Sequence, residues 1–397
     1  MAAGERMNTG LSIAVIAACP FPYPRGTPIR ILRMAESLVA RGHHVEVISY
    51  HLGQRVVDLP FVVHRIPRVP TYHRLAPGPS YQKLLLVDPL LTLRVLSVVR
   101  SRRFDVIHAH HYEGLLAALP AARLLRIPLV FDVHTLLSTE LPHYSLGLPK
   151  ALLCNLGDAL DRMLPRRADH IVAVTHAIRS RLMHEIGISA DRITTIYTGV
   201  EAEHFHTAAA PDPRVAARTL IYTGTLEDYQ RIDLMLMAFR RVLDQQSDVR
   251  LKIVSDASLG PYRSLIRDLG LQEHLDLIQA DYFHLPEILH TAVIALSPRV
   301  VCDGLPIKML NYMATGRAIV AFRGSAEILE HDRTAIVVPD NDVEAFSAAI
   351  LALLDDPLRA QMLGNNARAR VEEFFVWESA AIALEKIYGG LLSPRLT

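Results

Sequence analysis

The sequence has little of what marks a secreted, membrane-spanning or nucleic-acid-binding protein. Its 397 residues include three cysteines, Cys19, Cys154 and Cys302, which are too few and too widely spaced for a disulfide framework. The apolar run 11–19 is too short to cross a bilayer and follows a start without the features of a secretory signal. The formal net charge of +1 supplies no basic field for nucleic acid. We therefore expect a cytoplasmic protein without a nucleic-acid partner.

A longer hydrophobic stretch, 83–100, is interrupted by Asp88, Pro89 and Arg94, so we expect any membrane contact to be peripheral. Half of all residues are hydrophobic and 21% are charged, which indicates a globular protein with a large core. At about 150 residues per domain, the length predicts two or three domains.

Short apolar segments alternate with helical patterns along the whole chain, which predicts parallel sheets covered by helices on both faces. In the first half the predicted strands are 11–19, 44–50, 105–110, 128–134, 170–175 and 192–197. In the second half they are 219–224, 250–255, 275–279, 293–298, 318–322 and 335–339. Helical patterns at 343–354, 357–375 and 377–391 end the chain.

The pattern restarts after a polar stretch at 198–218, so we expect two domains, 1–200 and 201–375. The predicted fold class is α/β, with two Rossmann-like doubly wound domains facing a central cleft. The C-terminal helix, 376–397, is expected to pack back on the first domain. Ligands of such sheets bind beyond the carboxyl ends of the strands, which places the predicted site in the loops there.

The segment 297–322 has the residues of an anion site. A strand ends near Pro298, and a helix predicted to begin at Ile307 offers unpaired N–H groups and the positive end of its dipole. Lys308 lies in the first turn of that helix, and Arg299 offers a guanidinium suited to phosphate. The alternative is an ordinary strand–loop–helix unit whose charges are merely solvated.

This segment resembles the donor-site signature of the retaining glycosyltransferases of family 4, which have the GT-B fold. The family carries two glutamates eight positions apart; the first contacts the transferred sugar and the second the ribose. The matching positions are Asp303, beside Gly304 in the loop, and Asn311. Both depart from Glu, although Asp keeps a carboxylate and Asn keeps a hydrogen-bond acceptor.

The resemblance extends over nearly the whole chain, through segments 30–50, 104–118, 130–137 and 168–205. Its main departure concerns two cations that the family places on the donor diphosphate. Thr225 and Gln230 stand at those positions. We expect Arg231, Arg299 and Lys308 to substitute for them. Otherwise catalysis is weak and Arg231 is a solvated residue at a helix start.

Three further positions follow from the resemblance. His134, at the end of a strand, matches a family histidine near the donor phosphate and the transferred sugar, where an imidazole could donate to a phosphate oxygen. Gly26 and Thr27 lie in the loop that the family uses near the acceptor. Glu327 matches a frequent family acid. The alternatives are a buried structural histidine for His134 and a carboxylate at a helix start for Glu327.

No metal or other cofactor is expected, since the nucleotide-sugar is a substrate. His108 and His110 share a strand face, but no third ligand follows at a suitable spacing. The segment Asp340-Asn341-Asp342 precedes a predicted helix and is interpreted as its N-cap.

Segment 55–103 is locally basic, with nine basic residues against two acidic ones, interleaved with leucines and tyrosines. This pattern suits a surface that docks on anionic lipid, and the alternative is a core helix with a solvated charged face.

The resemblance implies retaining transfer of a sugar from a nucleotide-sugar to a hydroxyl acceptor in glycolipid or surface polysaccharide assembly. The acceptor is left open, a lipid-linked one included. Two alternatives remain open at this point. One is a sugar-nucleotide 2-epimerase of the same fold. The other is a non-catalytic protein that binds sugar nucleotides, which the missing cations and the Asp and Asn substitutions would favour.

Overall fold

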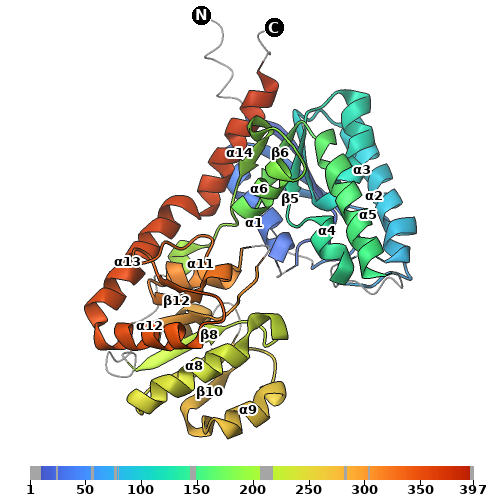
Figure 1. Ribbon diagram of the computed structural model, residues 1–397. Helices are drawn as coiled ribbons and strands as arrows, with labels where there is room; N and C mark the ends of the chain where they lie inside the picture. Colours follow the sequence, from blue (N-terminus) through green and yellow to red (C-terminus); the bar gives the residue numbers. More distant parts are fainter. Residues whose placement is uncertain are drawn as a thin grey trace, which may run out of the picture. The chain divides into compact units, whose positions relative to one another are not determined.

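The computed structural model describes residues 10–23, 26–54, 58–75, 78, 80–143, 149–205, 218–280, 284–302 and 305–393 (Figure 1). The chain divides into two compact units, of which the first is 1–198 with 377–397 and the second is 199–376. Each is built on a parallel sheet covered by helices, so the predicted α/β class with two Rossmann-like sheets is confirmed.

The first unit has a seven-stranded sheet in the order β3-β2-β1-β4-β5-β6-β7. All its neighbouring strands run parallel. The strand order reverses between β1 and β4, and this switch point is where open parallel sheets bind ligands. The strands are β1 (Ser12–Ala17), β2 (His44–Ser49), β3 (Val62–Arg65), β4 (Val106–His110), β5 (Leu129–Val133), β6 (His170–Ala173) and β7 (Ile193–Thr195).

Alternate side chains of β1 point to opposite faces and enter two different cores. Ile13 and Val15 pack in the core that also holds buried side chains of α1 (Gly26–Ala40) and α14 (Trp377–Leu392). Ala14 and Ile16 pack in the core formed with α2 (Asp88–Ser101), α3 (His111–Leu125) and α6 (His176–His184). The short α4 (Leu137–Glu140) and α5 (Lys150–Met163) complete this unit.

The C-terminal helix α14 belongs to the first unit and lies against α1. Trp377 and Tyr388 are both buried there. Tyr388 is fully buried, and its hydroxyl lies 2.8 Å from Nδ1 of His108 on β4. The last helix of the chain therefore reaches the side chains at the centre of the first sheet.

The second unit has a six-stranded parallel sheet in the order β10-β9-β8-β11-β12-β13. Its strands are β8 (Thr219–Thr223), β9 (Arg250–Val254), β10 (Leu275–Ile278), β11 (Ile294–Ser297), β12 (Ala318–Phe322) and β13 (Ile336–Val338). Its helices are α8 (Ile232–Gln245), α9 (Arg263–Asp268), α10 (Leu285–His290), α11 (Ile307–Ala314), α12 (Val343–Asp355) and α13 (Pro357–Phe374). Side chains of α8 and α12 share a core with β8, β9 and β11.

All twelve predicted strands occur, and β3 is an additional one. β3 lies at the sheet edge and is only partly buried, so its sequence lacks the apolar run of a central strand. Asp342 caps α12 as expected, its Oδ1 accepting from the Ala345 N–H at 2.8 Å. None of the helices in the described part of the chain has the length and apolar content needed to span a membrane.

Gly26 and Thr27, which were expected in the loop before α1, form the first turn of this helix. The helix begins at Gly26, whose φ of +38° an L side chain rarely adopts. The Thr27 hydroxyl is thereby free to lie 3.2 Å from Nδ1 of His134.

Candidate functional site

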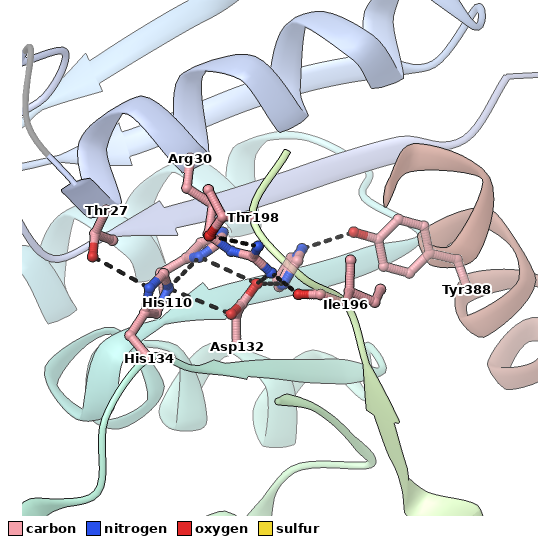
Figure 2. Close-up of polar contacts among 9 residues, drawn as sticks. Thr27, Arg30, His110, Asp132, His134, Ile196, Thr198 and Tyr388 are labelled. Atoms are coloured by element: carbon pink, nitrogen blue, oxygen red, sulfur yellow. Dashed lines mark hydrogen bonds and ion pairs between the residues drawn. The ribbon is translucent and has the colours of Figure 1, made fainter. Parts of the chain in front are cut away.

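The carboxyl ends of β4 and β5 bring a set of buried polar side chains together in the first unit (Figure 2). β4 supplies His108 and His110, β5 supplies Asp132, and His134 follows β5. Because β4 and β5 are adjacent and parallel, their ends lie at the same edge of the sheet.

A buried ion pair lies at the centre of this set. Nη2 of Arg30, from α1, is 3.1 Å from Oδ2 of Asp132, and both side chains are almost completely buried. The same guanidinium donates to the Ile196 carbonyl at 2.9 Å and to the Thr198 hydroxyl at 3.4 Å. Burial alone would raise the pKa of the Asp132 carboxyl, but Arg30 and the neighbouring imidazoles hold it well below its usual range. Asp132 is therefore ionised at neutral pH.

Two imidazoles, those of His110 and His134, lie beside this ion pair. Nδ1 of His110 lies 3.2 Å from Nε2 of His134, whose Nδ1 faces the Thr27 hydroxyl. Burial lowers the pKa of both His110 and His134 well below the usual range, so both rings are neutral at pH 7. Nε2 of His134 is also 3.4 Å from Oδ1 of Asp132. This approach is electrostatic and not a hydrogen bond, but the negative carboxylate favours a proton on the nearer ring nitrogen, so we assign the His134 proton to Nε2, which leaves Nδ1 as an acceptor.

Asp132 is a third candidate metal ligand beside the two histidines of β4. His108, His110 and Asp132 each offer one ligand atom, and these atoms lie within 4.8 Å of one another. Sequence spacing did not reveal Asp132 because it comes from the neighbouring strand. The carboxylate already binds the Arg30 guanidinium, which a cation would have to displace. The expectation that no metal takes part stays a prediction.

In the second unit, Lys308 lies at the carboxyl ends of β8 and β11, in the first turn of α11. Its Nζ donates to Oε1 of Gln230 at 2.8 Å and lies 4.1 Å from the centre of the Tyr222 ring. A Cβ added to Gly224 would lie 3.7 Å from the same nitrogen. The ammonium thus binds Gln230, one of the two positions at which the family cations are missing, and stands beside Gly224, which precedes the other one, Thr225. Burial, with a further contribution from Arg299, lowers the pKa of Lys308 to about 7.

The two arginines differ in their availability. Arg299 stacks its guanidinium 4.9 Å from the centre of the Tyr229 ring and donates from Nε to the Val301 carbonyl at 2.6 Å. Arg231 forms a two-pronged ion pair with Asp233 and donates to Oδ1 of Asn341 at 2.7 Å. A phosphate would therefore have to compete with a carboxylate for Arg231.

The remaining candidates of the second unit are neutral or acidic residues. Thr225 is exposed, with its hydroxyl 3.3 Å from that of Tyr229. Asn311 on α11 is buried, and its Oδ1 has no hydrogen-bond partner among the described residues. Glu327 is exposed in a turn after a short 3-10 helix, so its interpretation as a residue at a helix start is wrong. Asp303 and Gly304 lie outside the described residues.

Several residues of these clusters were absent from the sequence-based candidates. Arg30 looked like an ordinary helix residue, and Asp132 one member of an apolar strand. The signal that could have found Asp132 is a charged residue inside the apolar strand sequence LVFDV. In the structure its side chain is 0% exposed. Gln230 and Tyr222 were not expected as partners of Lys308, because the contact is formed by segments about eighty residues apart.

Comparison with known proteins identifies the family. A model described as Glycosyltransferase Family 4 matches residues 24–204, and one described as Glycosyl transferases group 1 matches residues 217–356. The chain belongs to the family 4 glycosyltransferases. It is 25% identical to an MMP α-(1→4)-mannosyltransferase of Mycolicibacterium hassiacum, over 95% of this chain and 98% of the relative. It is 26% identical to a glycogen synthase of Mycobacterium tuberculosis, over 75% of this chain and 72% of the relative.

Solved structures share the fold of this glycosyltransferase. A sucrose-phosphate synthase from Thermosynechococcus elongatus superimposes with a TM-score of 0.77 at 19% identity, covering 96% of this chain and 99% of that one. HepE from Anabaena, solved in complex with UDP, superimposes with a TM-score of 0.75 at 16% identity, covering 96% and 100%. At these identities the likeness establishes the GT-B fold.

Replacement of Asp132 tests the buried ion pair. In Asp132→Asn the Arg30 guanidinium would stay buried without its counter-ion, so we expect the free energy of unfolding to fall by about 3–5 kcal/mol. Urea denaturation followed by circular dichroism measures this change. Asp158→Asn, at an exposed position of α5, is the matched control and should change stability by less than about 0.5 kcal/mol. A similar small effect in both variants would contradict the assignment.

Proposed function

We propose that this glycosyltransferase transfers a sugar from a nucleotide-sugar donor to a hydroxyl acceptor with retention of the anomeric configuration. The second unit would hold the donor nucleotide and the first unit the acceptor. The observation that carries the proposal is the placement of Lys308 at the strand ends of the second unit, beside Gln230 and Gly224.

Lys308 fits a diphosphate for two reasons. Its ammonium stands where the two cations of the family would act, and it has no carboxylate partner among the described residues. The N-terminus of α11 adds unpaired N–H groups in the same place. Arg299, stacked on Tyr229, supplies a second positive charge. Arg231 is left out of the proposed phosphate site, because Asp233 already binds it.

The rest of the donor is assigned to α11 and the loop before it. Asn311 presents a buried carbonyl oxygen without a partner in the described part of the chain, and a ribose hydroxyl would satisfy it. Asp303 keeps its proposed role on the transferred sugar on the basis of the family motif, next to Gly304.

For His134 the proposed role changes. A neutral ring with its proton on Nε2 accepts at Nδ1, so it would receive a hydrogen bond from a sugar hydroxyl and would not donate to phosphate. Thr27 lies at that nitrogen, and Gly26 beside it leaves the surface open, since a Cβ added to this glycine would meet no atom within 4 Å.

The proposed chemistry needs no protein nucleophile. The bond between the anomeric carbon and the phosphate oxygen breaks, and the acceptor oxygen bonds to the same face of that carbon. The acceptor proton passes to the departing phosphate oxygen. The protein contributes positioning and stabilisation of the charge that develops on the diphosphate. Relatives named as mannosyltransferases and a glycogen synthase support assembly of glycolipid or polysaccharide as the setting.

Lys308 variants test the donor site. Lys308→Ala should weaken binding of the best nucleoside diphosphate by about tenfold to a hundredfold, because a charge-assisted contact is worth about 1.5–3 kcal/mol. Since the lysine is charged below pH 7 and loses its proton above it, wild-type affinity should fall by up to about tenfold per pH unit from pH 7 to 9.

Calorimetric titration with UDP, GDP and ADP at several pH values measures both effects. Lys308→Arg is the matched control: it keeps a permanent charge, so its affinity should not fall between pH 7 and 9. Unchanged affinity in Lys308→Ala would refute the site.

Activity should not depend on a divalent metal, because the proposed phosphate partners are Lys308, Arg299 and the N-terminus of α11. Turnover should be equal with and without a chelator. Loss of turnover that magnesium or manganese restores would contradict the proposed donor site. Loss that zinc restores would assign a metal to His108, His110 and Asp132.

Peripheral membrane contact is proposed through the π-helical segment η2 (Lys83–Val87), where Leu84 and Leu85 are 63% and 68% exposed. Each nearby cation adds about 1 kcal/mol on an anionic surface. The double variant Leu84→Ser, Leu85→Ser should sediment less with anionic vesicles at low salt. Leu152→Ser with Leu156→Ser, at exposed positions of α5, is the matched control. If wild type does not sediment with such vesicles, this contact does not exist.

A further inference from the structure

A cavity of about 400 Å³ opens at the carboxyl ends of β1 and β4, the switch point of the first sheet. Six leucines line this cavity, which we call the leucine cavity. These are Leu75, Leu116, Leu137, Leu141, Leu160 and Leu164. Cys19 and Thr27 after β1, and His111 after β4, line the same space.

Most polar side chains of the leucine cavity are already paired within the chain. Lys83 forms a buried ion pair with Glu113. The Tyr112 hydroxyl donates to Asp161 at 2.5 Å, and Thr135 binds Glu140. A carbohydrate would need many unpaired donors and acceptors here, whereas the six leucines make much of the remaining surface hydrocarbon; Arg74 is a further cation in the lining.

His111 is the exception. Its imidazole makes no hydrogen bond among the described residues and stacks 4.5 Å from the ring of His134. Its φ of +62° is unusual for a residue with a side chain and is typical of strained positions at functional sites. Burial lowers the pKa of this ring, so it is neutral and can accept from a hydroxyl.

A second cavity of about 560 Å³ adjoins the first, and both are lined by Tyr23 and Leu75. Its charged lining residues are Arg65 and Arg68, with His51 and His73 beside them and no acidic side chain. Arg65 is fixed by the carbonyls of Leu52 and Gln54. Arg68 has no ion pair among the described residues, so it is available to an anion.

We propose that the acceptor is an anionic amphiphile that carries a hydroxyl group, which deepens and rests on the proposed glycosyl transfer. Its hydroxyl lies at His111, its hydrocarbon part fills the leucine cavity, and its anionic group lies at Arg68. A lipid in a bilayer and a soluble alkyl phosphate share this chemistry, so the probes are used as monomers in solution.

Calorimetric titration with decyl phosphate, decyl β-D-glucoside and methyl β-D-glucoside, below their micelle concentrations, tests the proposal. The decyl glucoside should bind at least about tenfold more tightly than the methyl glucoside, because its longer alkyl chain removes apolar surface from water in the leucine cavity. Decyl phosphate should bind about fivefold more tightly again, and added salt should remove this second gain. Equal affinity for the two glucosides would overturn the assignment. Equal affinity for the two decyl probes would overturn its anionic part.

Two variants locate the binding. Leu116→Asn, at a half-exposed position of α3 that lines the cavity, should weaken both decyl probes by about tenfold. Leu124→Asn, on the exposed side of the same helix and outside the cavity, is the matched control and should change neither. Arg68→Ser should weaken decyl phosphate alone. If Leu116→Asn leaves both affinities unchanged, the probes bind elsewhere and the proposal is wrong.

Failure of this proposal is distinguishable from failure of the proposed function. Binding of decyl probes without binding of any nucleoside diphosphate would support the amphiphile site and contradict glycosyl transfer. Nucleotide binding and turnover onto methyl glucoside with no preference for the decyl probes would support transfer and overturn the amphiphilic acceptor.

Discussion

The buried ion pair of Arg30 and Asp132 holds the first unit's site together. Two charges that lose water at this depth cost several kcal/mol each, and the cost is offset by their mutual attraction and by the hydrogen bonds of the guanidinium to Ile196 and Thr198. Arg30 comes from α1, Asp132 from β5, and the Ile196 carbonyl from the chain just after β7, so one guanidinium ties three separate segments. The ionised carboxylate lies 3.4 Å from Nε2 of His134, and its negative charge is the reason for assigning the ring proton to that nitrogen. The chemistry available at the surface of this unit is therefore decided in its interior.

Much of the fold could be predicted from the sequence because it depends on local pattern. Apolar runs of five to nine residues between helical segments mark central parallel strands. The edge strand β3 was missed because its residues are only partly buried. Gly26 and Thr27 were placed in the loop before α1, because no propensity rule foresees a helix that begins at a glycine with a positive φ. The site was less predictable, since the contacts of Lys308 with Gln230 and of Arg30 with Asp132 join segments distant in sequence.

The second unit gives a physical reason for one of the two missing family cations, the one at position 230. Gln230 accepts from the Lys308 ammonium, and Tyr222 offers that ammonium the face of its ring. A lysine at position 230 would place two ammonium groups within hydrogen-bond distance of each other, in a partly buried pocket. The neutral Gln230 is compatible with Lys308. The pocket thus keeps a positive charge, supplied by Lys308 in place of a cation at position 230. The lowered pKa of Lys308 is the cost of that burial, and it makes the charge sensitive to pH near neutrality.

The neutral imidazoles of the first unit and the cations of the second imply a division of roles. A histidine whose pKa lies well below 7 cannot neutralise a leaving diphosphate, and a ring that accepts at Nδ1 is suited to a hydroxyl. In the proposed reaction, the negative charge that develops when the glycosidic bond to phosphate breaks is assigned to Lys308, Arg299 and the N-terminus of α11. The same proposal assigns hydroxyl groups of sugar and acceptor to His134 and His111, which stack on each other. Under this division, loss of the Lys308 charge should slow the chemical step, whereas loss of an imidazole should mainly misplace the reacting hydroxyls.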